Sequence, residues 1–169
     1  SALPSDHPLN VGMLGMHGNY GPNILTNECD VLIAIGMRFD DRVTGNLATY
    51  AKQAKVIHFE IDPAEVDKNV KTDVAVLGDV KESLAALLPL VEAKSHEAWH
   101  NEFKEKYKIE LESVINDELN PKGEGISMGE TIEMINKHSN GDAIMVSDVG
   151  QHQMFTCRYS KFNQSKSNI

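Results

Sequence analysis

Two arginines and two aspartates stand together after a short apolar run, in the sequence G-M-R-F-D-D-R at residues 36–42. A guanidinium binds a carboxylate or a phosphate through two parallel hydrogen bonds, so this cluster is suited to holding an anion. The same residue types also suit a plainer role, in which Arg–Asp ion pairs fix a loop. The residues alone leave both interpretations open.

Acidic residues follow two further apolar runs. Glu60 and Asp62 come after the run at 55–59, and Asp79 comes after the run at 73–77. An acid that ends a strand of a nucleotide-binding sheet accepts hydrogen bonds from ribose hydroxyls. An aspartate before proline is equally typical of a turn, and one before a helical pattern is typical of an N-cap. No G-x-G-x-x-G follows any of the runs, so the usual dinucleotide fingerprint is absent.

Two histidines stand close to glycines. His17 lies in G-M-H-G at 15–18, and His152 follows Gln151 at an expected strand-to-helix junction. Free amides at a helix N-terminus attract phosphate, and these polar side chains add donors there. The plainer alternatives are a tight turn at the first site and, at the second, an exposed helix start capped by Asp148. The remaining histidines show no metal-ligand spacing, so no metal site is expected within the chain.

Alternating apolar and helical patterns must position these residues. Continuous apolar runs at 30–36, 55–62 and 73–79 predict strands buried on both faces. Helical pieces are expected at 22–29, 46–54, 63–68 and 80–93. This alternation is typical of a parallel sheet with covering helices, and such sheets bind ligands at the carboxyl ends of their strands. The fold class is therefore α/β.

A change in pattern after about residue 95 predicts a domain boundary. Aromatic and apolar residues recur every fourth position up to residue 118 and predict one apolar helix face: Trp99, Phe103, Tyr107 and Leu111. Glycine and proline at 120–125 then break the helix. A capping box of Ser127 and Glu130 predicts a helix to about residue 137, followed by a strand at 143–147 and a final helix.

Composition excludes some classes of function. The chain has 169 residues, 16 basic against 25 acidic, and a net charge of −9, which argues against binding nucleic acid. No apolar run reaches the roughly 18 residues of a membrane span. Two cysteines, Cys29 and Cys157, lie far apart in the sequence and indicate reduced thiols in a cytoplasmic protein.

Five motifs together resemble the large catalytic subunits of the acetolactate synthase (acetohydroxyacid synthase) family in order and spacing. They are M-L-G-M-H-G at 13–18, G-M-R-F-D-D-R-V-T-G at 36–45, I-D-P-A-E-V-D-K-N at 61–69, G-D-V at 78–80 and V-G-Q-H-Q-M at 149–154. The resemblance covers essentially the whole chain. It implies a partial Rossmann-like (DHS-like NAD/FAD-binding) central domain at 1–94, a helical linker at 95–125, and the first part of a thiamine-diphosphate-binding α/β domain at 126–169.

The resemblance also implies which residues contact cofactors. The FAD contacts it implies are Leu14, Gly15, Met16, His17, Gly36, Met37, Arg38, Phe39, Asp40, Asp41, Arg42, Glu60, Ile61, Gly78 and Asp79. It implies that Gln151 and His152 contact thiamine diphosphate. Arg42 resembles the residue that holds the carboxylate of the second 2-oxo acid, and FAD in this family has a structural role.

The implied reaction condenses pyruvate with a second pyruvate or with 2-oxobutanoate, in branched-chain amino-acid biosynthesis. The activating glutamate and the Mg²⁺ ligands of the family lie outside this sequence, so we expect a fragment that is inactive and binds FAD weakly or not at all. Family members form homo-oligomers and bind a small regulatory subunit. Two alternatives remain: another thiamine-diphosphate carboligase such as glyoxylate carboligase, and a non-catalytic nucleotide-binding module.

Overall fold

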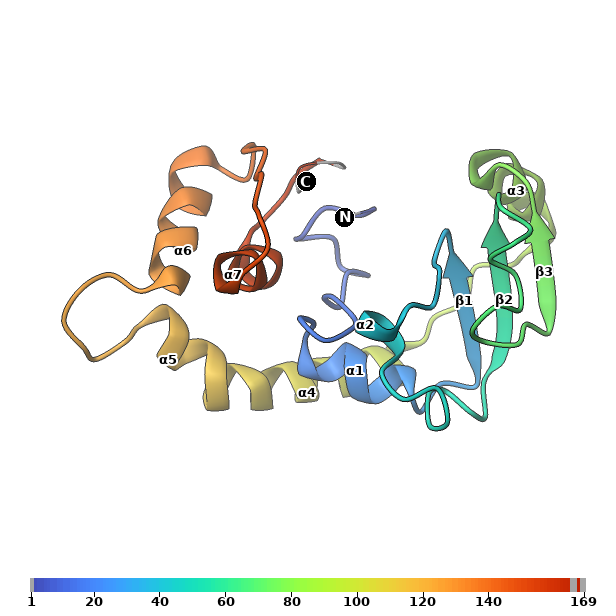
Figure 1. Cartoon of the computed structure of the whole chain (residues 1–169), viewed down its shortest axis with the longest axis horizontal. Helices are drawn as coiled ribbons and strands as arrows, with labels where there is room; N and C mark the ends of the chain where they lie inside the picture. The colour runs from blue at the N-terminus through green and yellow to red at the C-terminus, as the bar shows by residue number, and fades with distance from the viewer. Residues whose placement is uncertain (1, 165–166, 168–169) are drawn as a thin grey trace. The chain divides into compact units, whose positions relative to one another are not determined.

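The computed structural model describes residues 2–164 and 167, which form two compact units. One unit runs from Asn23 to Trp99 and contains the sheet. The other combines the N-terminal residues up to Pro22 with the chain from His100 onward, and it is built from helices and loops (Figure 1).

A parallel sheet of three strands forms the centre of the first unit. Its strands are β1 (Val31–Ile35), β2 (Lys55–Glu60) and β3 (Val74–Leu77), in the order β1-β2-β3. Ile33 pairs with Ile57, and His58 pairs with Ala75. The expected α/β class with a parallel sheet is confirmed.

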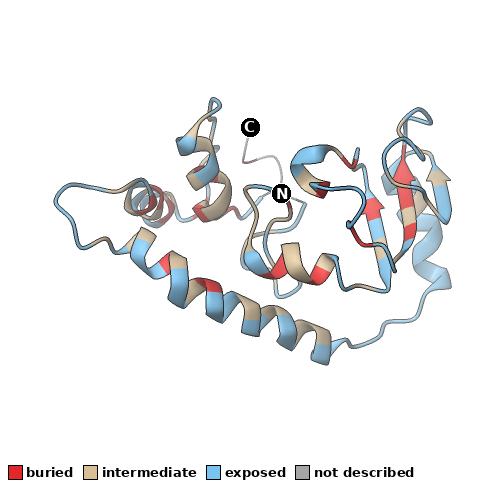
Figure 2. Ribbon diagram, turned by 60° about the horizontal axis from the view of Figure 1, so that its bottom comes forward, coloured by how far each residue is buried: buried red, intermediate tan, exposed pale blue. Residues whose placement is uncertain are grey.

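The expectation of strands buried on both faces is met at the end of β2, where His58 and Phe59 are 0% and 5% exposed, but not in β1 and β3. Val31, Ile33 and Ile35 of β1 are 45%, 56% and 47% exposed. They point to the same face because side chains alternate along a strand. The opposite face carries the core, which consists of Ala34, Phe39, Tyr50, Ala51 and Val56 (Figure 2).

Four helical pieces were expected between residues 22 and 93, and those at 22–29 and 80–93 form, as α1 (Tyr20–Thr26) and α3 (Val80–Leu87). Two helices follow the strands of this unit. α2 (Asp41–Thr44) follows β1, and α3 follows β3 and continues as a 3₁₀ turn at Leu88–Leu90. The helices expected at 46–54 and 63–68 are wrong, since both segments form turns. Each segment contains a residue with a left-handed backbone, Ala51 with a φ of +41° and Asp67 with a φ of +60°, which a right-handed helix excludes.

Helices form most of the second unit. α1 (Tyr20–Thr26) begins in this unit, and α4 (Glu97–Glu110) continues through a π turn (Leu111–Ile115) into α5 (Asn116–Leu119). α6 (Met128–Ser139) and α7 (Gln151–Tyr159) complete it. Ile115, Ile132 and Tyr159 form its core. The predicted capping box of Ser127 and Glu130 is confirmed.

Three details of this unit differ from the sequence predictions. Tyr107 is 52% exposed, because residues spaced by four drift around a helix of 3.6 residues per turn and the inner face passes to Glu110. The strand expected at 143–147 is reduced to one bridge, in which Met145 N–H donates to Ser167 O at 2.7 Å. Asp148 does not cap α7; its carboxylate accepts from the N–H of Val149 instead.

Candidate functional site

The ends of the three parallel strands lie side by side at one edge of the sheet. Gly36 N–H donates to Phe59 O at 2.8 Å, and Gly78 N–H donates to Glu60 O at 3.1 Å. These bonds bring together the segments at 36–42, 60–61 and 78–79, which the sequence analysis assigned to one ligand. We call this group of segments the strand-tip site.

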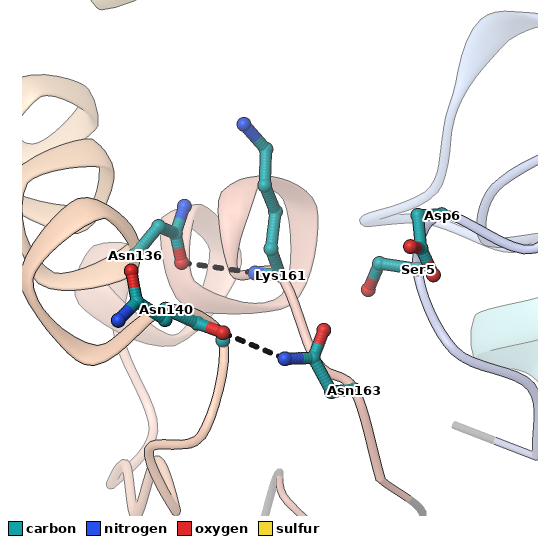
Figure 3. A pocket seen from close by; sticks show the side chains of 7 residues that line it. Ser5, Asp6, Asn136, Asn140, Lys161 and Asn163 are labelled. Atoms are coloured by element: carbon teal, nitrogen blue, oxygen red, sulfur yellow. Dashed lines mark hydrogen bonds between the residues drawn. The ribbon is translucent and has the colours of Figure 1, made fainter.

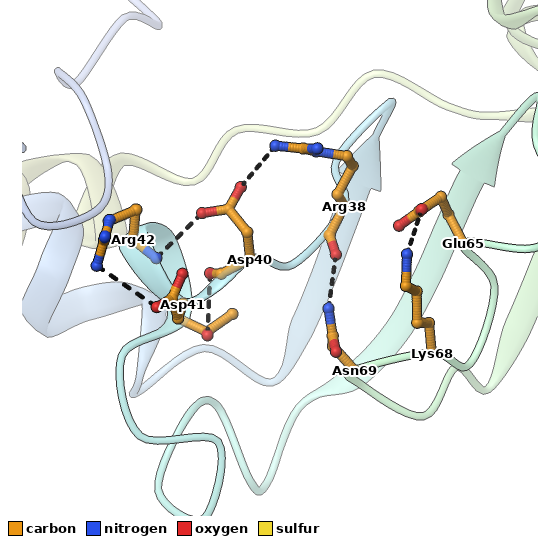
Figure 4. A network of polar contacts seen from close by, with 8 residues as sticks. Arg38, Asp40, Asp41, Arg42, Glu65, Lys68 and Asn69 are labelled. Atoms are coloured by element: carbon orange, nitrogen blue, oxygen red, sulfur yellow. Dashed lines mark hydrogen bonds and ion pairs between the residues drawn. The ribbon is translucent and has the colours of Figure 1, made fainter. Parts of the chain in front are cut away.

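Ion pairs order the R-F-D-D-R loop of the strand-tip site (Figure 4). Arg38 lies 3.7 Å from Asp40, and Arg42 lies 3.4 Å from Asp41. Both arginine side chains are 71% exposed, so each exposed pair contributes little to stability. The guanidinium groups can therefore exchange these aspartates for an anionic ligand at low cost.

Asp40 has a second role, as the N-cap of α2. Its carboxylate accepts from the N–H of Arg42 at 3.0 Å, and its carbonyl accepts from the hydroxyl of Thr44 at 3.1 Å. The sequence analysis identified this segment as a loop and missed the helical turn. The turn fixes the direction of the chain after Asp40 and holds Arg42 in its first turn.

The side chain of Phe39 turns away from the strand-tip site. It is 2% exposed and lies in the core, and Met37 packs against the same cluster. Their side chains are therefore engaged in packing, and any contact that Phe39 makes with a ligand must come from its main chain. The ligand contact predicted for Phe39 is therefore limited to its main-chain atoms.

Glu60 is buried and oriented at the tip of β2. Its Oε1 accepts from the N–H groups of Ile61 and Asp62 at 2.9 and 3.2 Å, and its Oε2 lies 3.7 Å from Nε2 of His58. Both ring nitrogens of His58, which is fully buried, lack a hydrogen-bond partner among the described residues. The second oxygen of Glu60 therefore accepts no hydrogen bond from this imidazole, although it lies within ion-pair distance of it. Ile61 beside it is 71% exposed and presents an apolar surface.

The loop after β2 is tied to the R-F-D-D-R loop. Asn69 Nδ2 donates to the carbonyl of Arg38 at 3.2 Å, and Lys68 pairs with Glu65 at 2.6 Å (Figure 4). Hydrogen bonds from the N–H and hydroxyl of Thr72, both at 2.7 Å, lower the pKa of Asp67. These contacts hold the loops after β1 and β2 in one arrangement.

The backbone at the strand-tip site fits a closely approaching ligand. Gly36 has a φ of +60°, and a Cβ added there would meet no heavy atom within 4 Å. The space above Gly36 is thus open, and the positive φ strains any side chain placed there. Asp79 has the N-cap role that was the alternative to ligand contact: its carboxylate accepts hydrogen bonds from the N–H groups of Lys81 and Glu82, in the first turn of α3, at 2.9 and 3.2 Å.

The segment Leu14–His17 lies in the other unit. Gly18 N–H donates to Gly15 O at 2.9 Å, which is the tight turn expected as the plainer alternative. Within it, Nδ1 of His17 is buried without a hydrogen-bond partner in the described part of the chain. Met16 is 61% exposed. An unpaired buried nitrogen beside an exposed apolar side chain fits an amphipathic ligand.

Gln151 and His152 occupy the first turn of α7, and both are exposed. This turn contains no acidic residue, and its N-cap, Gly150, offers no side-chain bond. A Cβ at Gly150 would come within 2.8 Å of the His152 ring. A turn with these properties is suited to a phosphate group.

A pocket that the sequence analysis did not identify lies in the same unit. It has a volume of about 330 Å³ and none of the predicted site residues lines it (Figure 3). Its lining residues are Ser5, Asp6, Asn136, Asn140, Gly141, Lys161 and Asn163. Asn136 Oδ1 accepts from Lys161 N–H at 2.9 Å and Asn163 Nδ2 donates to Asn140 O at 2.6 Å, so these amides are used in holding the pocket's own walls.

Among the described residues, no group of three or more His, Cys, Asp or Glu residues could hold a metal ion. No helix in the part of the chain that the structure describes is long and apolar enough to cross a membrane.

A comparison with protein families matches residues 1–87 to the model "Thiamine pyrophosphate enzyme, central domain". The chain belongs to this family. The match includes the whole strand-tip site and the Leu14–His17 segment. The expected Rossmann-like central domain is thereby confirmed as the class of the N-terminal half of the chain.

Curated relatives extend the similarity over nearly the whole chain. An acetolactate synthase large subunit from Parasynechococcus marenigrum is 43% identical over 94% of this chain and 25% of its own length. A probable acetolactate synthase large subunit from Methanocaldococcus jannaschii is 41% identical over 98% of this chain and 29% of its own. An acetolactate synthase large subunit from Lactococcus lactis is 41% identical over 99% of this chain and 28% of its own length. These matches confirm the family resemblance found in the sequence. The chain spans between a quarter and three tenths of the length of these relatives.

Proposed function

We propose that this chain is part of an acetolactate synthase large subunit, which condenses pyruvate with pyruvate or 2-oxobutanoate. The observation that carries the proposal is the convergence of the segments at 36–42, 60–61 and 78–79 at one edge of a parallel sheet. The similarity to large subunits over at least 94% of the chain supports the same reaction.

The strand-tip site and the Leu14–His17 segment are proposed to hold FAD in a structural role. The exposed guanidinium groups of Arg38 and Arg42 and the main-chain N–H groups near Gly36 would bind its phosphates. The second oxygen of Glu60 would accept from a ribose hydroxyl. We assign FAD to these residues because the donors, the acceptor and the open space above Gly36 match a nucleotide.

Gln151 and His152 are proposed to donate hydrogen bonds to the phosphates of thiamine diphosphate, which is bound with Mg²⁺. Thiamine diphosphate, when bound, supplies the electron sink for cleaving the bond next to the carbonyl group of a 2-oxo acid. Arg42 would orient the second 2-oxo acid by pairing with its carboxylate. The proposal includes a cytoplasmic homo-oligomer with a small regulatory subunit, as in the resemblance described above.

The test is acetolactate formation by the complete polypeptide with thiamine diphosphate, Mg²⁺ and FAD. We expect activity with pyruvate and none with glyoxylate, and the reverse preference would replace this proposal with a glyoxylate carboligase. Arg42→Ala should raise the KM for pyruvate by about 10- to 100-fold, equivalent to a lost charged hydrogen bond. Lys55→Ala, at the opposite end of β2, is the control and should leave KM unchanged.

The 169-residue chain on its own should form no acetolactate under the same conditions. The residues proposed here bind and orient ligands, while the activating glutamate and the Mg²⁺ ligands are expected from other parts of the complete polypeptide. Measurable acetolactate from the purified chain would contradict this division of roles.

A further inference from the structure

Glu110 is a buried carboxylate that connects three segments of the helical unit. It ends α4 and is 4% exposed. Its Oε1 accepts a hydrogen bond from Nη2 of Arg158 at 2.5 Å, and its Oε2 accepts from the N–H of Tyr20 at 3.1 Å. A charge removed from water needs such partners, and Glu110 thereby connects Tyr20 and Arg158 to the end of α4.

The bond to Tyr20 holds the start of α1, three residues after His17. α1 has no acidic residue in its own first turn. Glu110 therefore supplies, from 90 residues away, the negative charge that a helix N-terminus favours. Close packing supports the same contact, because a Cβ added at Gly21 would lie 3.5 Å from the Phe103 ring.

The bond to Arg158 holds α7, the helix that begins with Gln151 and His152. Arg158 lies in the last turn of α7, six residues after His152, or about 9 Å along the axis at 1.5 Å per residue. Its side chain is 22% exposed, and its guanidinium also lies 5.8 Å from the centroid of the Tyr159 ring. The ion pair with Glu110 therefore holds the Arg158 side chain in a mostly buried position.

A change in helix type directly follows Glu110. The π turn at Leu111–Ile115 begins directly after Glu110, and such turns occur preferentially at functional sites. The turn changes the face that the helix presents, so that Ile115 enters the core one turn after Glu110 enters the polar contact.

We propose that Glu110 is a positioning residue that couples the Leu14–His17 segment to the start of α7. The inference rests on the proposed function, in which the first segment contacts FAD and the second contacts thiamine diphosphate. Ligand binding to either segment restricts its motion, and Glu110 transmits that restriction to the other. Coupling of this kind is reciprocal, so each cofactor raises the affinity for the other by the same factor.

The experiment measures the Kd of FAD by quenching of flavin fluorescence in the complete enzyme, with and without saturating thiamine diphosphate and Mg²⁺. For the wild type, we expect the Kd to fall by about fivefold or more when thiamine diphosphate is present. In Glu110→Gln, the ratio should fall to less than about twofold, as expected when the coupling energy is lost. Glu133→Gln is the matched control, since it removes an exposed carboxylate that pairs with Lys161 at 3.3 Å, and its ratio should equal that of the wild type.

A second variant distinguishes loss of coupling from loss of folding. Glu110→Met/Arg158→Met leaves no buried charge and removes the hydrogen bonds of Glu110, so it should fold while still showing a ratio below about twofold. A wild-type ratio of one, or variants that keep the wild-type ratio, would overturn the inference. Acetolactate formation is measured in parallel: a wild type that couples the two cofactors without forming acetolactate contradicts the proposed function and leaves the positioning role intact.

Discussion

The imidazole of His58 lies edge-on to the phenyl ring of Phe39, with the ring centroids 5.1 Å apart and the ring planes inclined at 73°. His58 is on the central strand β2, and Phe39 lies in the loop after β1 with a φ of +51°. The contact draws Phe39 into the core and leaves its neighbours, Arg38 and Asp40, on the outside. One buried aromatic pair thus determines which side chains of the R-F-D-D-R loop can meet a ligand.

Phe39→Ala should destabilise the sheet unit strongly. The ring is 2% exposed and also packs at 6.4 Å against Tyr50, so its removal leaves a cavity. We expect the free energy of unfolding to fall by about 3–5 kcal/mol, measured by urea denaturation with far-UV circular dichroism. Leu90→Ala is the control, because Leu90 is 81% exposed and its change should stay within about 0.5 kcal/mol. A loss equal to that of the control would contradict the packing described here.

The stability of the sheet unit should decline at alkaline pH because of Tyr50. Burial, together with the nearby Cys29, raises the pKa of Tyr50 to about 12 from its ordinary value of 10.0. The folded state therefore keeps the phenol proton at a pH where the unfolded state loses it. The stabilisation is complete below pH 10 and is lost as the pH rises through about 12.

Tyr50→Phe tests this directly. The Tyr50 hydroxyl is buried and has no hydrogen-bond partner among the described residues, so the variant should be at least as stable as the parent at pH 8. At pH 11 its urea midpoint should fall less than that of the parent, because no buried phenol remains to ionise. Tyr107→Phe removes a half-exposed phenol and should keep the parent's pH dependence. If the urea midpoints of Tyr50→Phe and the parent fall equally between pH 8 and pH 11, the pKa of Tyr50 is not raised by burial.

Local patterns predicted the three strands of the sheet well, for physical reasons. The runs at 31–35, 55–60 and 74–77 are apolar and bounded by Gly or Asp, and neighbouring residues alone determine where they start and stop. The helices expected at 46–54 and 63–68 did not form, because Ala51 and Asp67 within them have a left-handed backbone. Ala51 N–H donates to Asn27 and Asp67 accepts from Thr72 N–H, and a helical pattern does not reveal these contacts.

The convergence of the segments at 36–42, 60–61 and 78–79 was predictable from the sequence, and the packing of their side chains was less so. The ion pairs of Arg38 and Arg42 join residues one or two positions apart, so the sequence already contained them. The burial of Phe39 depends on His58 in another strand, and the Glu110 contacts span 48 and 90 residues. Such contacts depend on how the chain folds back on itself, and one sequence carries no local signal for them.

Asp79 allows its capping role to be separated from the proposed FAD contact. Asp79→Ala should cost about 1 kcal/mol of stability, because two N–H groups at the start of α3 lose their acceptor. Asp79→Asn keeps a cap oxygen and should be nearly as stable as the parent by urea denaturation. If the carboxylate also contacts FAD, Asp79→Asn should weaken FAD binding in the complete enzyme without lowering stability. Equal stability of the Ala and Asn variants would contradict the capping role.

The isolated chain should self-associate through the sheet. Among the described strands, β1 pairs with β2 alone, and its exposed face presents Val31, Ile33 and Ile35. An exposed apolar edge strand is a template for pairing with another copy, and a lysine on such a strand opposes it. Light scattering across a concentration series should show oligomers of the parent chain and a lower mass for Ile33→Lys. Leu90→Lys places the same charge off the strand and should leave association unchanged, whereas a monodisperse monomeric parent would rule the mechanism out.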